Sequence, residues 1–144
     1  METKQKKEIV VAVSGYFDPI HAGHIECIEL ARKLGDKLIA IVNNDEQAIL
    51  KKGYVFMPLK ERIKIVQSLK FVDEVFASID KDNSVCKSLE AVKPDIFAKG
   101  GDRTAGEIPE SKICNELGIK IVDGLGAKIQ SSSTLVEKSR EFQN

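Results

Sequence analysis

Five short apolar segments, each ending in Gly, Asn or Ser, are the feature that most constrains how this chain can fold. They are rich in β-branched residues, and their apolar character is continuous rather than alternating with polar residues. Strands of this kind are buried on both faces, as they are in a parallel sheet. We therefore predict five strands, over residues 9–14, 37–43, 73–78, 95–100 and 119–124.

Segments with apolar residues at helical spacing lie between these strands. The first begins at Ala22, carries apolar residues three and four positions apart, and stops at Gly35. The last begins in a serine-rich turn that suits a helix N-cap. We predict helices within residues 22–35, 58–69, 84–92, 108–118 and 131–140.

The alternation of strand and helix predicts βαβ units with right-handed crossovers. The expected fold class is α/β, with a Rossmann-like, three-layer α/β/α arrangement around an open, parallel, five-stranded sheet. The 144 residues are close to the usual size of one domain, and no linker or repeat divides them. We therefore expect a single domain over residues 1–144.

Composition argues against several classes of function. The 22 basic and 22 acidic residues cancel, so a surface built to neutralise a nucleic-acid backbone is not indicated. No stretch approaches the roughly 18 apolar residues that span a bilayer, and no apolar segment of signal-peptide type follows the basic start METKQKKE. The three cysteines form no CxxC pair, which fits a reducing compartment. We expect a cytoplasmic protein with neither nucleic-acid nor membrane partners.

Glycine-rich and polar segments follow four of the predicted strands. They are YFDPIHAGH after the first, NNDEQ after the second, KGGDR after the fourth and a Ser/Thr cluster after the fifth. Open parallel sheets bind ligands at the carboxyl ends of their strands, near the switch in strand order. We expect these segments to meet at one edge of the sheet and to form the functional site.

Both histidines of the chain, His21 and His24, lie in the first of these segments. Zinc would need a further strong ligand, and neither a third histidine nor a suitably placed cysteine is present, so we expect no metal site built from side chains. Helix capping is a second interpretation, because the pair lies at the start of a predicted helix. A phosphate site is the third: Gly23 lets a ligand approach the backbone, and two imidazoles beside a helix N-terminus suit phosphate oxygens.

The segment GYFDPIHAGH resembles the G-x-F-D-x-x-H-x-G-H motif of the HxGH nucleotidylyltransferase superfamily. That superfamily includes cytidylyltransferases, archaeal-type FAD synthetases and heptose-1-phosphate adenylyltransferases, and the resemblance covers nearly the whole chain. It implies that His21 and His24 are catalytic and donate hydrogen bonds to α-phosphate oxygens. It also implies that the nucleotide is bound by Gly15, Tyr16, Phe17, Asp18 and Gly23.

Two further segments resemble the superfamily. NNDEQAILKKG resembles a segment in which an acidic pair precedes a lysine and a glycine, which implies that Lys51 or Lys52 reaches phosphates. A solvated helix end is the alternative for these lysines. MPLKERIKIVQSLKFVDEV resembles a helix with an internal Glu-Arg, which implies that Arg62 lies near the acceptor. An ordinary surface pair with Glu61 is the alternative.

KGGDR resembles the K-G-G-D of heptose-1-phosphate adenylyltransferases, the members to which the chain is most similar. The resemblance implies that Lys99 faces phosphate, that Gly100 allows close approach of the ligand, and that Asp102 contacts ribose or base. A plain turn is the alternative. Arg103 stands where those enzymes usually carry an aromatic residue, and it is a candidate for binding the acceptor.

The segment IQSSSTLVEK resembles the superfamily's Ser/Thr-rich turn, typified by I-S-T-S. It implies that Ser132, Ser133 and Thr134 hold the β- and γ-phosphates, with simple helix capping as the alternative. Cytidylyltransferases usually carry R-T-E-G before this turn, whereas this chain has GLGAKIQ. That departure, together with KGGD, favours ATP over CTP.

The resemblance thus implies a nucleotidylyltransferase that transfers AMP from ATP to a phosphate-bearing acceptor, such as a sugar 1-phosphate in lipopolysaccharide core biosynthesis. Pyrophosphate would be released, Mg²⁺ would accompany the nucleoside triphosphate, and the protein would be a homodimer. The alternatives are a CTP-dependent glycerol-3-phosphate cytidylyltransferase and an archaeal-type FAD synthetase acting on ATP and FMN. A non-catalytic nucleotide-binding sensor module is an alternative of another class.

Overall fold

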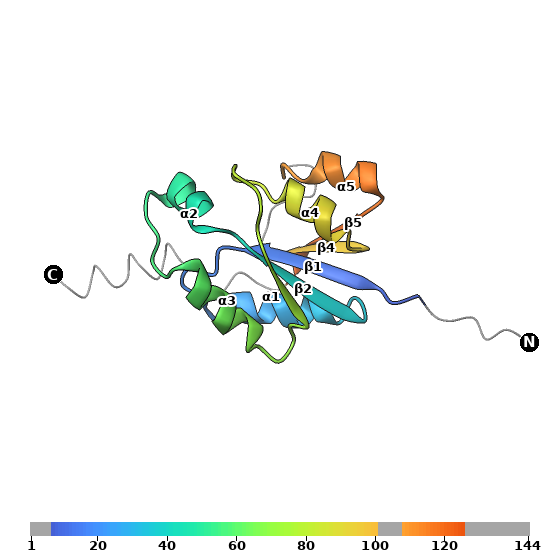
Figure 1. The fold of residues 1–144 in the computed structure, drawn as a ribbon. Coiled ribbons are helices and arrows are strands. Elements are labelled where there is room, and N and C mark those ends of the chain that lie inside the picture. Colours follow the sequence, from blue (N-terminus) through green and yellow to red (C-terminus); the bar gives the residue numbers. More distant parts are fainter. Residues whose placement is uncertain (1–6, 101–107, 126–144) are drawn as a thin grey trace, which may run out of the picture.

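The computed structural model describes residues 7–100 and 108–125, which form an α/β fold around a five-stranded sheet (Figure 1). The strands are β1 (Val10–Gly15), β2 (Lys37–Val42), β3 (Glu74–Ala77), β4 (Ile96–Gly100) and β5 (Lys120–Leu125). Every pairing is parallel, and the order across the sheet is β3-β2-β1-β4-β5. The five strands predicted from the sequence are confirmed, each close to its expected range.

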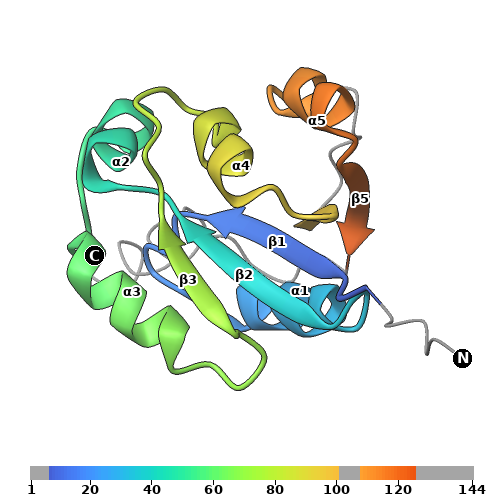
Figure 2. The same ribbon diagram turned by 45° about the vertical axis from the view of Figure 1, so that its right-hand side comes forward.

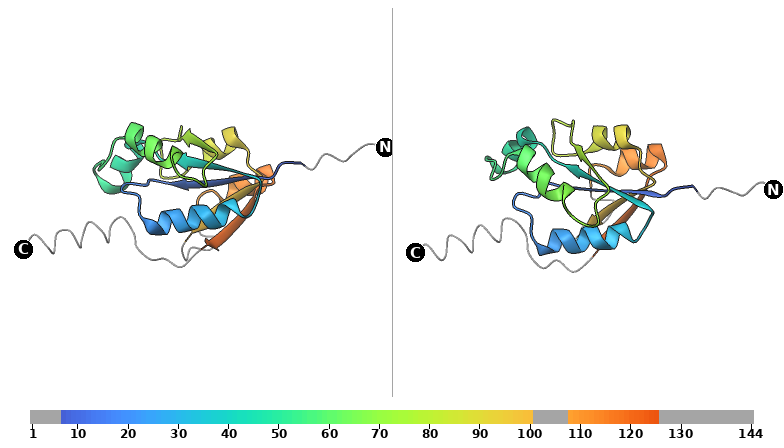
Figure 3. Two further views of the ribbon diagram at one scale, coloured as in Figure 1. Left: turned by 90° about the horizontal axis from the view of Figure 1, so that it is seen from below. Right: turned by 60° about the horizontal axis from the view of Figure 1, so that its bottom comes forward.

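Helices cover both faces of the sheet, as the three-layer prediction requires (Figures 2 and 3). One face carries α1 (Ala22–Arg32) and α3 (Leu59–Gln67), and the other carries α4 (Cys86–Val92) and α5 (Ser111–Leu117). A further helix, α2 (Asp45–Lys52), begins directly after β2 and was not predicted from apolar spacing. The helix predicted over 131–140 lies outside the described residues. Within the described ranges, no helix combines the length and apolar character needed to cross a membrane.

Each face of the sheet has its own apolar core, because neighbouring residues of a strand point to opposite faces. Val11 and Val13 of β1 pack beneath α1 and α3. Ala12, which lies between them, packs with Phe97 of β4 beneath α4 and α5. All four side chains are buried. Burial on both faces explains why the strand sequences are continuously apolar.

The strand order places a crevice beside β1. From β1 the chain adds β2 and then β3 on one side, and afterwards crosses back to add β4 and β5 on the other. The order therefore reverses between β1 and β4. Connections leave in opposite directions at such a point, and this is where open α/β sheets bind ligands at their carboxyl edge.

Candidate active site

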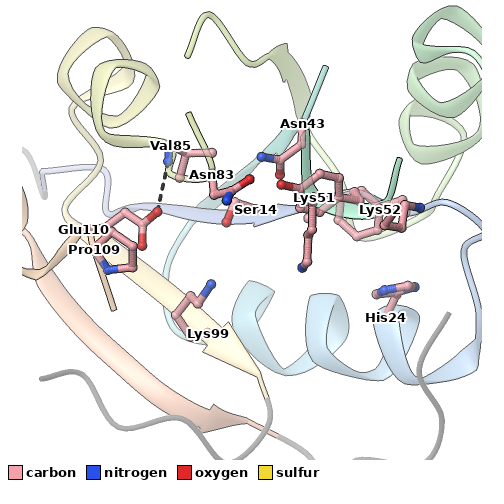
Figure 4. Close-up of a pocket in the computed structure, with 13 residues that line it drawn as sticks. Ser14, His24, Asn43, Lys51, Lys52, Asn83, Val85, Lys99, Pro109 and Glu110 are labelled. Carbon is pink, nitrogen blue, oxygen red and sulfur yellow. Dashed lines mark hydrogen bonds between the residues drawn. The ribbon is translucent and has the colours of Figure 1, made fainter. Parts of the chain in front are cut away.

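A pocket of about 570 Å³ opens at this edge of the sheet (Figure 4). Its walls come from the carboxyl ends of β1, β2 and β4, the start of α1, the end of α2, and the segments before α4 and α5. The segments after β1, β2 and β4 therefore meet, as the sequence predicted. The described residues that line the pocket are Ser14, Gly15, Tyr16, Phe17, His24, Asn43, Lys51, Lys52, Asn83, Val85, Lys99, Pro109 and Glu110.

The two histidines close the N-terminus of α1 by capping one another. Nδ1 of His21, the residue before the helix, accepts a hydrogen bond from the backbone N–H of Gly23 at 3.1 Å. Nδ1 of His24 accepts one from the backbone N–H of His21, also at 3.1 Å. Reciprocal caps of this kind normally pair Ser or Thr with Glu or Gln. The capping interpretation is therefore correct for the Nδ1 atoms, and Gly23 contributes its N–H to the cap.

These contacts determine where the imidazole protons lie. A ring nitrogen that accepts from an N–H carries no proton, so each neutral ring is protonated on Nε2. Burial is the larger cause that lowers the pKa of His24 to about 4, and the neighbouring His21 is the smaller one. Burial also lowers the pKa of His21. The two rings stack at 3.9 Å between centroids. At pH 7 each ring is therefore neutral and presents an Nε2–H for which the described residues supply no acceptor.

His24 is the member of the pair that lines the pocket, and Phe17 fixes its ring. Phe17 is buried, has a positive φ of 51°, and meets the His24 ring edge-on at 5.1 Å between centroids. A Cβ atom on Gly15 would lie only 2.8 Å from the Phe17 ring, so a larger residue there would displace it. Gly15 and Phe17, predicted to bind nucleotide, both line the pocket and also hold the histidine in place.

Asp18 does not line the pocket. Its side chain is fully buried, and its carboxylate accepts hydrogen bonds from the backbone N–H groups of Phe56 and Met57 at 2.8 and 2.6 Å. Nζ of Lys52 lies 3.2 Å from the same carboxylate. Asp18 thus ties the loop after α2 to the histidine segment. We assign it this positioning role in place of the nucleotide contact that the resemblance implied.

Lys51 and Lys52 both line the pocket from the last turn of α2. Nζ of Lys52 donates to both the carboxylate and the backbone oxygen of Asp18. Nζ of Lys51 instead lies 4.6 Å from the centre of the Tyr16 ring, and its side chain extends into the pocket (Figure 4). Lys51 is therefore better placed to reach a phosphate, whereas Lys52 is held by Asp18.

Arg62 lies behind the pocket and not in its wall. It is wholly buried in α3. Its guanidinium donates four hydrogen bonds, to the backbone oxygens of Met57, Tyr16 and Asn43 and to the carboxylate of Asp45. These contacts join the loops that follow β1 and β2. The expectation that Arg62 contacts the acceptor is therefore corrected, since burial and these bonds leave it facing protein.

Lys99 and Gly100 lie at the end of β4. Lys99 lines the pocket, and its side chain extends into it (Figure 4). Gly100 does not line it; a Cβ there would lie 2.9 Å from Sγ of Cys27, so glycine allows β4 to approach α1 closely. The other predicted site residues lie outside the described part of the chain; they are Asp102, Arg103, Ser132, Ser133 and Thr134.

Four polar lining residues were not predicted individually from the sequence, although one of them, Asn43, begins the segment NNDEQ that was expected at the site: Ser14, Asn43, Asn83 and Glu110. Ser14 and Asn43 lie at the ends of the neighbouring strands β1 and β2, so their position after an apolar run was a usable signal. Asn83 and Glu110 precede α4 and α5 and belong to no motif. They reach the pocket because the chain crosses back over the sheet.

The donor set of the pocket does not form a resident metal site. No three His, Cys, Asp or Glu side chains in the described ranges are grouped so that they could hold a metal ion. Mg²⁺ is commonly held by substrate phosphates, water and one or two carboxylates. The described lining residues therefore do not by themselves supply a complete set of protein ligands for a metal ion.

The fold and the pocket define an α/β protein with a lysine-lined pocket at the switch in strand order. The chain belongs to the cytidylyltransferase-like family, whose model matches residues 12–136. This confirms the superfamily resemblance that the histidine motif indicated.

Similar proteins agree with this assignment. The chain is 35% identical over 139 residues to the bifunctional protein HldE of Desulfatibacillum aliphaticivorans, covering 95% of this chain and 28% of that protein. It is 37% identical over 99 residues to the FAD synthase of Pyrococcus horikoshii, covering 67% of this chain and 66% of that protein. A lipopolysaccharide core biosynthesis protein from Thermoplasma volcanium has a similar structure, with a TM-score of 0.70, 28% identity, and coverage of 81% of this chain and 96% of that one. The chain thus spans only 28% of the HldE relative's length.

Proposed function

We propose that this chain is a nucleotidylyltransferase that transfers AMP from ATP to a phosphate-bearing acceptor such as a sugar 1-phosphate. The observation that carries the proposal is the neutral imidazole of His24, which presents an Nε2–H in a pocket also lined by Lys51, Lys52 and Lys99. Family membership and the similarity to HldE and FAD synthase support the same chemistry. A role in lipopolysaccharide core biosynthesis belongs to this proposal.

In the proposed reaction, a phosphate oxygen of the acceptor attacks the α-phosphorus of ATP. A new P–O bond forms while the bond to the α–β bridging oxygen breaks, and pyrophosphate leaves with the bonding electrons. The nucleophile is already an oxyanion, so no base is needed and catalysis depends on positioning and charge stabilisation. Nε2–H of His24 donates to an α-phosphate oxygen as negative charge builds up on it. His21, which does not line the pocket, is assigned a second donor role by resemblance alone.

Cations complete the proposed site. Lys51 and Lys99 enter the pocket from α2 and β4, where they neutralise phosphate charge. Mg²⁺, which offsets triphosphate charge when bound, would be held by the phosphates and water. By resemblance alone, Asp102 is assigned to the nucleoside, Arg103 to the acceptor, and the β/γ-phosphates to Ser132, Ser133 and Thr134.

A second acceptor, FMN, is favoured by one feature of the loop after α2. Tyr54 is 41% exposed and Phe56 is 58% exposed, and Nζ of Lys52 lies 5.4 Å from the centre of the Tyr54 ring. Exposed aromatic rings beside a pocket lysine suit a flat aromatic acceptor that carries a phosphate. The similarity to an FAD synthase points in the same direction.

Pyrophosphate release, measured for each of the four nucleoside triphosphates with sugar 1-phosphates, glycerol 3-phosphate and FMN, tests the proposal. Release with ATP and a sugar 1-phosphate is expected. Release with ATP and FMN alone would select the second acceptor, and release with CTP and glycerol 3-phosphate would select the cytidylyltransferase. Tight nucleotide binding without pyrophosphate for any acceptor would contradict the enzyme and support a sensor module.

Assembly and location are part of the proposal. The homodimer and the cytoplasmic location stay predictions; sedimentation equilibrium and cell fractionation check them.

A further inference from the structure

The two ends of the pocket differ in chemical character (Figure 4). His24, Lys51 and Lys52 lie at one end, Val85, Pro109 and Glu110 lie at the other, and Lys99 lies between them. A nucleoside triphosphate is divided in the same way, into an anionic triphosphate and a neutral nucleoside. The cationic end attracts the phosphates, so the nucleoside lies toward the end that contains Glu110.

Glu110 is a buried carboxylate with unused acceptor capacity. It is only 5% exposed and precedes α5. Its Oε2 accepts a hydrogen bond from the backbone N–H of Val85 at 2.9 Å, at the start of α4. The part of the chain that the structure describes gives it no second hydrogen bond and no ion pair. A carboxylate accepts about four hydrogen bonds, and a buried one needs partners. Glu110 therefore presents acceptor sites on the pocket wall.

Tyr16 supplies a complementary group between the two ends of the pocket, because the centre of its ring lies 4.6 Å from Nζ of Lys51 while its hydroxyl is within electrostatic range of Glu110. Its hydroxyl is buried and has no hydrogen-bond partner among the described residues. Burial raises the pKa of Tyr16, and the negative charge of Glu110 is the next cause, so the two groups lie within electrostatic range. A hydroxyl both donates and accepts. The pocket thus contains a donor and an acceptor that the described protein does not pair.

We propose that Glu110 and Tyr16 bind the nucleoside part of the nucleotide, with the Glu110 carboxylate accepting a hydrogen bond from a ribose hydroxyl or from the amino group of the base. The carboxylate repels phosphate, so a neutral donor is the group that fits this end. The bound nucleotide is therefore oriented with its triphosphate toward α1 and its nucleoside toward α5. Taking ATP as that nucleotide rests on the proposed function.

The direction in which ATP affinity changes in Glu110→Gln distinguishes a direct hydrogen bond from a long-range effect of charge. In Glu110→Gln the side-chain oxygen still accepts from the Val85 N–H, but an NH₂ donor replaces the second acceptor and the negative charge is lost. Removing that charge alone strengthens the binding of every anion. Loss of a hydrogen bond to a charged group lowers the affinity for ATP by about 10-fold or more. We therefore expect Glu110→Gln to bind ATP more weakly and to bind inorganic tripolyphosphate equally or more tightly. Both affinities are measured by calorimetry without acceptor.

Tyr16→Phe is the second variant, and it removes one oxygen that no described residue uses. It should keep the unfolding temperature of the wild type. Its affinity for ATP should fall by about 3-fold, while its affinity for tripolyphosphate stays unchanged. This variant carries the test if Glu110→Gln fails to fold, which the unliganded melting curve reports. Equal or parallel changes in ATP and tripolyphosphate binding overturn the proposal.

Three analogues identify the donor: 2′-deoxyATP, 3′-deoxyATP and ITP, which lacks the amino group of adenine. The wild type should bind at least one of them about 10-fold more weakly than ATP, and Glu110→Gln should no longer discriminate against it. If the wild type binds all three as well as ATP, the proposal is wrong. Binding is read without turnover, so a protein that discriminates in this way but never releases pyrophosphate would refute only the proposed function.

Discussion

Two helices that follow one another along the chain, α1 and α2, begin with the same reciprocal cap but use its side chains differently. In α2, Oδ1 of Asn44 accepts from the backbone N–H of Gln47 and Oε1 of Gln47 accepts from that of Asn44, at 2.9 and 3.0 Å. Their amide nitrogens then donate to four backbone oxygens in the segment 78–84. In α1 the cap uses Nδ1 of His21 and His24, and neither Nε2–H has an acceptor among the described residues.

The difference separates a structural cap from a functional one. The amide pair is completely bonded to protein, so it anchors the loop that follows β3. The imidazole pair uses one nitrogen of each ring for the helix and leaves the other as a neutral donor, with His24 in the pocket wall. Substitutions in the two caps should therefore have opposite consequences for stability and turnover.

His24→Ala should lower turnover at least about 100-fold, on the scale of losing one donor to transition-state charge, with a smaller effect on ATP affinity. Steady-state pyrophosphate release measures it. His24→Gln is the matched control, because Gln47 shows that glutamine forms the same cap in this protein. That variant should keep the wild-type stability. Its amide nitrogen remains a donor, as it does in Gln47, so it should recover part of the turnover that His24→Ala loses. An unchanged rate in His24→Ala would remove the proposed role of the imidazole.

Asn44→Ala should show the reverse pattern. It removes an N-cap acceptor and two donors to the backbone oxygens of Ser78 and Asp80. We expect the free energy of unfolding to fall by about 1–3 kcal/mol, measured by denaturant titration, with turnover within about 3-fold of wild type. A variant that is stable but as slow as His24→Ala would show that the two caps are not functionally distinct.

Acid should destabilise the imidazole cap. The pKa of His24 is about 4 in the folded protein and near 6.5 in the unfolded chain, so the unfolded state binds the extra proton first. The stabilisation is complete above pH 6.5 and is lost as the pH falls toward 4, by up to about 1.4 kcal/mol per pH unit for one proton. Denaturant titrations at pH 7 and pH 5 measure the loss. His24→Gln should lose less of its free energy of unfolding between pH 7 and pH 5 than the wild type. An equal loss in both proteins would show that another group causes the pH dependence.

A zinc chelator should have no effect on the unfolding temperature. The described part of the chain has no group of three side chains that could hold a metal ion, and both Nδ1 atoms of the histidine pair already accept backbone hydrogen bonds. Thermal denaturation with and without chelator checks this. A chelator-dependent drop in melting temperature would restore the metal interpretation of His21 and His24.

The strands and the location of the site follow from the sequence because local chemistry determines both. Continuous apolar runs require burial on both faces, and the carboxyl ends of parallel strands lie on one edge, so the pocket position was predictable. The helix α2 was missed because its eight residues, DEQAILKK, are too short and polar to show an apolar stripe. Its cap at Asn44, followed by Gln47, was a signal of the kind that predicts a helix start.

Side-chain roles were less predictable, because a motif does not show which way its residues point. Asp18 and Arg62 carry charges that suit a ligand, yet both face inward and tie loops together. Glu110 lies in the pocket without belonging to any motif, because its position depends on how α5 is packed beside α4. Long-range topology determines such contacts, and spacing along the chain does not encode it.

The central claim is that the two imidazoles cap a helix through Nδ1 and present neutral Nε2–H donors to a nucleotide. Long-range ¹H–¹⁵N NMR of the imidazole rings tests it directly, since the chain contains only two histidines. We predict that both rings are neutral Nε2–H tautomers at pH 7 and that the Nε2 signal of His24 shifts when a non-hydrolysable ATP analogue binds. An Nδ1–H tautomer, an imidazolium at pH 7, or a His24 signal that ignores the nucleotide would contradict the claim.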